Sequence, residues 1–109
     1  MDLRDRAFAH AELFNAAVRS GDYSAFLETF AEDAVMRFET VPVGPFRGRP
    51  AIAAAYAAQP PTDTLSVRSV SEVDEDTAQV ALDYDNGGSG WMVVRWRDAQ
   101  VADLTIGFD

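Results

Sequence analysis

Apolar and polar residues alternate through most of the chain after Thr64, and this alternation constrains the fold more than any other feature. It occurs in four runs separated by short polar or glycine-containing segments: Leu65–Val73, Thr77–Tyr84, Trp91–Arg97 and Val101–Phe108. A period of two is typical of β-strands that turn one face toward a core. The glycine-rich Asn86–Gly90 and the pair Asp98 and Ala99 predict tight turns. The second half of the chain therefore predicts a run of antiparallel strands.

Helical spacing dominates the first thirty residues. Leu3–Ser20 predicts a helix, since at about 100° per residue one face collects Leu3, Ala7, His10, Phe14, Ala17 and Val18. Gly21 is suited to end this helix, and Asp22 to cap the next one. Four residues then recur at helical spacing and predict a short second helix with an aromatic stripe: Tyr23, Phe26, Leu27 and Phe30.

The middle of the chain predicts one strand and one further helix. Ala34–Thr40 alternates as a strand, with Met36 and Phe38 on one side. Val41–Arg49 is rich in Pro and Gly and predicts a loop or short hairpin. Pro50–Gln59 predicts a third helix, which begins at a proline and ends before two more. Helices segregated from a run of antiparallel strands define the α+β class, and a strongly curved sheet wrapped around the helices is the best packing solution.

Composition narrows the functional classes. The 109 residues predict one domain, 1–109, with a formal charge of −9. No cysteine or lysine is present, so a thiolate nucleophile or a lysine imine has no residue to form it. A single histidine argues against a multi-histidine metal centre, and no metal or cofactor is expected. Acidity argues against nucleic acid and anionic membranes as partners, and the charged N-terminus favours a cytoplasmic protein.

Several strings in the first half resemble one family. They are Gly21-Asp22, Phe30-Ala31-Glu32-Asp33-Ala34, Phe46-Arg47-Gly48-Arg49-Pro50-Ala51-Ile52 and Tyr56. Their order and spacing resemble the SnoaL-like branch of the nuclear transport factor 2-like superfamily, which includes ketosteroid isomerase and polyketide cyclases. The resemblance implies a cone in which three helices pack into a curved antiparallel sheet around a deep apolar pocket. It also implies a homodimer through the outer sheet face, where Val93, Arg95 and Thr105 are expected.

The best-known chemistry of that superfamily does not transfer to this chain. The resemblance places the isomerase tyrosine at Phe14, its proton-shuttling base at Phe38, and its late-strand acid at Met92 or Val93. All four residues are apolar, whereas the isomerase mechanism needs a base and two hydrogen-bond donors to an enolate oxygen.

Three hypotheses for function follow. The first is binding of a small hydrophobic ring compound, and six residues are its candidate ligand contacts: Phe14, Phe30, Phe38, Tyr56, Tyr84 and Trp96. The alternative is an isomerase- or cyclase-like enzyme with a relocated acid–base group, for which His10 and Glu39 are candidates. Each also has a structural interpretation: the aromatic residues as core, His10 as a histidine hydrogen-bonded to backbone, and Glu39 as a solvent-facing side chain. A non-catalytic dimeric association module of the same fold stays open.

Overall fold

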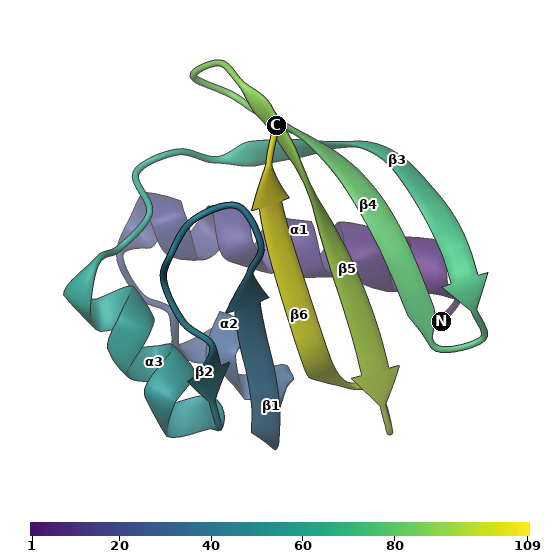
Figure 1. The fold of residues 1–109 in the computed structure, drawn as a ribbon, viewed down its shortest axis with the longest axis horizontal. Coiled ribbons are helices and arrows are strands. Elements are labelled where there is room, and N and C mark those ends of the chain that lie inside the picture. The colour runs from purple at the N-terminus through teal and green to yellow at the C-terminus, as the bar shows by residue number, and fades with distance from the viewer.

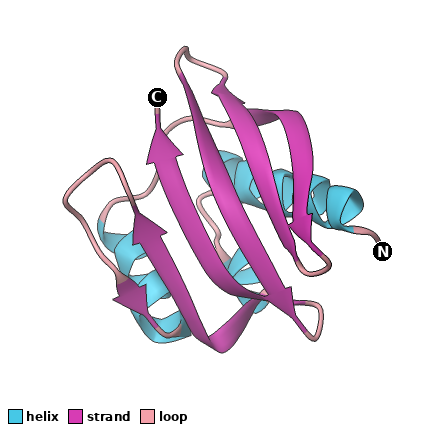
Figure 2. Cartoon of the chain, turned by 45° about the vertical axis from the view of Figure 1, so that its right-hand side comes forward, coloured by secondary structure: helices cyan, strands magenta, loops and turns pink.

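The three helices of the protein lie on one side of a curved six-stranded sheet, which confirms the predicted α+β class (Figures 1 and 2). The structure is a computed structural model that describes every residue from Met1 to Asp109. Its elements in chain order are α1 (Leu3–Ser20), α2 (Ser24–Glu28), β1 (Phe30–Phe38), β2 (Phe46–Arg47), α3 (Arg49–Ala58), β3 (Leu65–Asp74), β4 (Thr77–Tyr84), β5 (Ser89–Arg97) and β6 (Gln100–Phe108).

The sheet is mixed, which corrects the expectation of a purely antiparallel one. Its strand order is β2-β1-β6-β5-β4-β3, and every neighbouring pair is antiparallel except β1 and β6. These two strands run in parallel, with Val35 opposite Asp103 and Phe38 opposite Ile106. A parallel pair needs a long connection, and here α3 and the strands β3 to β5 supply it.

The helical spacing predicted that Phe30 belongs to the second helix, and this prediction is wrong. Phe30 is the first residue of β1. The helix ends at Glu28, and Phe30 lies opposite Val101 of β6. The Val101 N–H donates to the Thr29 carbonyl oxygen over 2.8 Å, and Arg49 Nε donates to the Phe30 carbonyl oxygen over 3.0 Å. Long-range pairing thus overrides a local helical preference at this position.

Helix α1 begins and ends at the predicted residues. The Asp2 carboxylate accepts a hydrogen bond from the Asp5 N–H over 2.8 Å, and Gly21 ends the helix in the left-handed region at φ 79°. The cap of helix α2 differs from the expected one. Tyr23 occupies the N-cap position, and Asp22, the residue before it, accepts a hydrogen bond from the Ser24 N–H. None of the helices combines the length and apolar character needed to cross a membrane.

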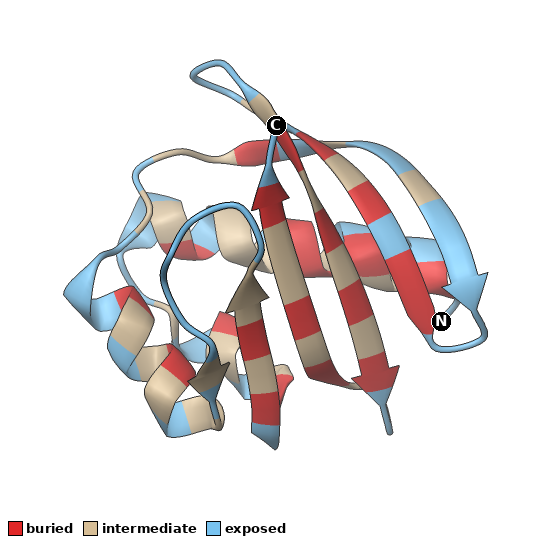
Figure 3. Ribbon diagram, viewed as in Figure 1, coloured by how far each residue is buried: buried red, intermediate tan, exposed pale blue.

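The core lies between the helices and the sheet face that they cover. Helix α1 packs against β3 and β4, and α3 packs against β1 and β2. Burial alternates along β5, where Met92, Val94 and Trp96 are buried, as the stripes in Figure 3 show. In β6 the expected alternation shifts at its start, and Val101 joins the core cluster in place of Ala102. Arg95 and Trp96 of β5 pair with Asp103 and Val101, so Ala102 is an extra, unpaired residue in β6, and this bulge changes the phase.

Candidate ligand-binding cavity

Three adjoining hollows surround Tyr56 between the helices and the end of the sheet where β1, β4 and β6 terminate. The α3 compartment has a volume of about 250 Å³ and is lined by Met36, Phe38, Phe46, Ala55 and Gln59 among others. The rim compartment, of about 280 Å³, is lined by Phe14, Phe38, Asp63, Tyr84, Ile106 and Phe108 among others. The inner compartment, of about 50 Å³, is lined by His10, Phe14, Met92, Leu104 and Ile106 among others. Because Tyr56 borders all three, we treat them as one cavity.

Aromatic rings form much of the wall of the rim and α3 compartments. Phe38 stacks on Phe108 at a centroid distance of 6.4 Å, and Tyr84 stacks on the same ring at 5.8 Å. Phe46 meets the edge of Phe38 at 6.4 Å. Such a wall, with few polar groups, suits an apolar ligand with a flat ring system.

Four of the six residues predicted to contact a ligand line this cavity: Phe14, Phe38, Tyr56 and Tyr84. The other two lie elsewhere. Phe30 is fully buried in the core, and Trp96 borders a separate hollow of about 120 Å³ together with Arg6 and Val101. Both are buried on the covered side of the sheet, as the alternation predicted for Trp96 alone. They lie at the end of the sheet opposite to Phe38 and Tyr84.

Sequence reasoning missed Phe46 and Phe108 as wall residues. Phe108 carried a usable signal, because it continues the apolar alternation of Leu104 and Ile106 to the end of β6. Phe46 carried none, since it lies in a segment whose pairing with Met36 of β1 is a long-range event.

The positions that the resemblance assigns to isomerase catalysis do lie on the cavity wall. Phe14 and Phe38 line the rim compartment, and Met92 lines the inner one. Val93, the other candidate for the late-strand acid, lies on the opposite face of β5 from Met92. The wall therefore holds no carboxylate or phenol at these three positions.

His10 borders the inner compartment and is 6% exposed. Its ring lies 5.1 Å from that of Phe26 and 6.0 Å from that of Phe30. Its Nδ1 atom is buried and has no hydrogen-bond partner, so this atom does not form the backbone hydrogen bond of the structural interpretation. Burial lowers the pKa of His10 to about 4, so the imidazole is neutral at pH 7.

Glu39 lies outside the cavity. Its side chain is exposed in a separate hollow lined by residues 37–39 and 41–45, and its N–H donates to the Ile106 carbonyl oxygen over 2.9 Å. The pairing of Phe38 with Ile106 continues without a bulge up to this point, so Phe38 keeps the inward position and Glu39 does not take it.

The carboxylates of Asp63 and Asp85 form hydrogen bonds between two segments beside the rim compartment. Both Asp63 carboxylate oxygens accept from the Asn86 N–H, each over 3.1 Å. Asp85 in turn accepts from the hydroxyls of Thr64 and Ser66, and these hydrogen bonds hold the pKa of Asp85 below its usual value. The segment before β3 is thereby joined to the turn between β4 and β5 beside the rim compartment.

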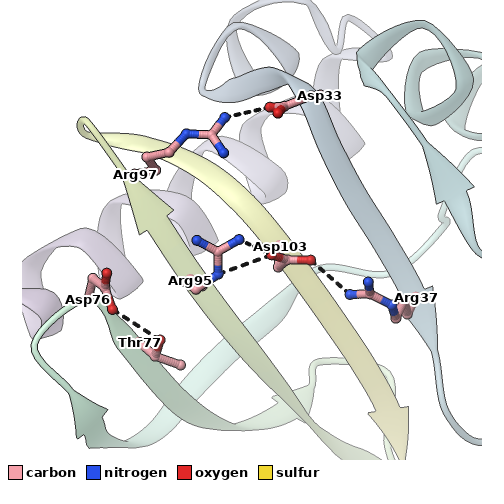
Figure 4. Close-up of polar contacts among 7 residues, drawn as sticks. All are labelled: Asp33, Arg37, Asp76, Thr77, Arg95, Arg97 and Asp103. Carbon is pink, nitrogen blue, oxygen red and sulfur yellow. Dashed lines mark hydrogen bonds and ion pairs between the residues drawn. The ribbon is translucent and has the colours of Figure 1, made fainter.

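A second polar group lies on the outer face of the sheet, away from the cavity (Figure 4). Asp103 accepts from Arg37 Nη1 over 2.8 Å and from Arg95 Nε over 3.0 Å. Burial acts to raise the pKa of Asp103, but the hydrogen bonds from the two arginines outweigh it and lower that pKa. Arg97 pairs with Asp33 nearby. No group of three or more His, Cys, Asp or Glu side chains is arranged to hold a metal ion.

A cone of three helices and a curved sheet around an apolar cavity defines the class of fold, and the sequence comparison identifies the family. Residues 11–104 match the SnoaL-like domain family. The chain belongs to this family and has the nuclear transport factor 2-like fold. A search of the curated proteins found no match.

Solved structures share the fold at low sequence identity. A Bacillus subtilis protein provisionally named an isomerase superposes with a TM-score of 0.80 at 18% identity, covering 100% of this chain and 90% of that one. SalBIII, an epoxide hydrolase/cyclase-like enzyme of pyran ring formation in the polyether salinomycin, gives 0.76 at 20% identity, covering 99% and 93%. RV0760c from Mycobacterium tuberculosis, solved in complex with estradiol-17β-hemisuccinate, gives 0.73 at 15% identity, covering 93% and 92%. At these identities the likeness concerns the fold alone.

Proposed function

We propose that this protein binds a small hydrophobic ring compound in the cavity around Tyr56. The observation that carries the proposal is the composition of the cavity wall. The rings of Phe14 and Phe38 stand at two positions that the resemblance assigns to isomerase catalysis, and they border adjoining hollows. The rim and α3 compartments each approach the lower end of the range of ligand pockets, about 300–1,000 Å³, and together they reach it. RV0760c, which shares the fold, was solved with estradiol-17β-hemisuccinate; the ring system of that ligand supports a ring compound as the ligand class here, and the proposal does not extend to its carboxylate.

Titration with 2-naphthol, followed by calorimetry and by the NMR signals of the Met36 and Ile106 methyl groups, tests this proposal. We expect saturable binding with selective shifts of both signals. An Ile106→Trp variant should fill part of the cavity and weaken binding at least about tenfold, or about 1.4 kcal/mol. Ala16→Trp is the control, because Ala16 is exposed on α1 and lines none of the three compartments. Absence of saturable binding, or equal loss in both variants, would reject the proposal.

A second candidate is an isomerase- or cyclase-like enzyme that uses His10 as its acid–base group. The burial of a neutral imidazole beside the inner compartment favours it over Glu39, which is exposed outside the cavity. Its low pKa makes His10 a weak base, and this argues for binding as the first choice. Exchange of the α-protons of 2-tetralone in deuterium oxide measures the reaction. The enzyme hypothesis requires exchange that His10→Phe abolishes and Glu39→Gln retains.

We also propose that two copies associate through the outer sheet face around Val93, Arg95 and Thr105. Val35 and Trp91 are half-buried on the same face and add apolar surface beside the Asp103 ion pairs. Sedimentation equilibrium should then show a dimer that Val93→Asp dissociates, whereas a monomeric wild type would contradict the proposal. Cytoplasmic location stays a prediction.

A further inference from the structure

Asp63 is the one side chain with a formal charge at neutral pH among the residues that line the three compartments. The wall contains no arginine, and burial keeps His10 neutral by lowering its pKa to about 4. A ligand in this cavity therefore meets one negative charge at the rim and no positive charge anywhere on the wall.

The Asp63 carboxylate is held in a fixed position. Both oxygens accept from the Asn86 N–H over 3.1 Å, and the residue is half-buried. A carboxylate has about four lone-pair sites, so its oxygens retain acceptor capacity for a ligand. Its negative charge also reaches Tyr84, whose pKa is raised first by burial and second by Asp63. The negative charge of Asp63 thus contributes to the electrostatic potential in the rim compartment, which the aromatic rings also line.

This arrangement treats charged ligands unequally. A ligand carboxylate at the rim would lose water, find no cationic partner on the wall and be repelled by Asp63. A protonated amine would instead form a charge-assisted hydrogen bond with Asp63 and lie near the rings of Tyr84 and Phe108, whose faces attract cations.

We propose that Asp63 is a specificity-determining residue: the cavity accepts ring compounds with an amine or hydroxyl group at their outer end and rejects those with a carboxylate there. This inference rests on the proposed binding function and names the ligand class for the same cavity.

Three probes of nearly the same ring system and different charge test it: 2-naphthylmethylamine, 2-naphthol and 2-naphthoate. For the wild type at low salt we expect the amine to bind at least about tenfold more tightly than the carboxylate, with 2-naphthol between them. Asp63→Asn, which keeps an oxygen for the Asn86 N–H, should reduce the amine-to-carboxylate ratio several-fold and change 2-naphthol binding less than about twofold. Raising ionic strength to 1 M should also reduce the wild-type ratio.

Asp83→Asn is the matched control, because it changes the net charge equally and lies on the outer face of β4, 3.8 Å from Arg68. It should leave the ratio unchanged. Equal binding of amine and carboxylate to the wild type, or an equal effect of the two substitutions, would overturn the inference while binding of 2-naphthol upholds the proposed function. Failure of 2-naphthol itself to bind would overturn both.

Discussion

Gly107 of β6 pairs with Trp91 of the neighbouring strand β5, and the indole ring of Trp91 lies directly over it on the outer face of the sheet. A β-carbon built on Gly107 would overlap the six-membered part of that ring and lie only 2.6 Å from its Nε1 atom. The backbone of Gly107 is an ordinary extended one, so the requirement for glycine here is steric. We therefore expect Gly107→Ala to reduce the free energy of unfolding by about 1–3 kcal/mol, measured by urea denaturation.

Trp91→Val supplies the control for this prediction. If the ring is the obstacle, adding Gly107→Ala to Trp91→Val should cost less than about 1 kcal/mol, and the double-mutant cycle should show a clear coupling energy. An equal cost in both backgrounds would mean that the backbone, and not the ring, requires glycine.

At the same scale, sequence could predict the direction of a side chain but not its depth. Period-2 alternation placed Phe38, Tyr84 and Trp96 on the covered side of the sheet, and all three face it. Whether an inward ring becomes core or cavity wall depends on how closely a helix approaches at that height of the sheet. Helix spacing arises from contacts between distant segments, so Trp96 was indistinguishable from Tyr84 before the fold was known.

At the scale of elements, Asn15 joins helix α1 to the first residue of edge strand β3. Its Nδ2 donates to the Leu65 carbonyl oxygen over 2.7 Å, and its Oδ1 accepts from the Leu65 N–H over 2.9 Å. One amide thus satisfies both backbone groups of a buried residue. Asn15→Leu should destabilise the protein by about 2–4 kcal/mol because it removes both bonds and leaves the Leu65 groups unpaired. It should also speed hydrogen exchange at the Leu65 amide.

Leucine has a higher helix propensity than asparagine, so a loss of stability in this variant does not come from the intrinsic preference for helix. The neighbouring Ala16 is exposed on α1, and Ala16→Leu should stay within about 0.5 kcal/mol of the wild type in the same chemical denaturation. Equal effects at the two positions would show that the Asn15 bridge contributes nothing to stability.

Element identity and order were largely predictable, whereas pairing between distant elements was not. The boundaries of α1 and the turn at Asp98 and Ala99 follow from local chemistry, since both turn residues adopt the left-handed conformation that a tight hairpin requires. The early start of β1 at Phe30 and its parallel alignment with β6 depend on contacts with residues about 70 positions away. Local spacing carries no information about such a partner.

At the scale of the whole molecule, His10 couples folding to pH. Unfolded, its pKa is about 6.5, and burial lowers it to about 4 in the folded protein. Between these two pH values the unfolded chain binds a proton that the folded chain does not, so stability rises with pH across this window and is complete above 6.5. A difference of this size predicts that about 3 kcal/mol is lost as the pH falls from 6.5 to 4.

The pH range from 4 to 6.5 distinguishes the contribution of His10 to stability from that of the paired carboxylates. Asp103 and Asp85 have lowered pKa values, so their contributions are present above the ordinary carboxylate pKa and disappear as the pH falls through their folded values. Urea denaturation from pH 4 to 7 should thus give a slope that both His10→Phe and His10→Asn flatten, because each removes the titrating ring. Since His10 is the single histidine of the chain, NMR titration of its ring protons reports the folded pKa directly. A midpoint near 6.5, or a slope that survives both substitutions, would show that the imidazole is hydrated and that the packing around it is looser than this structure has it.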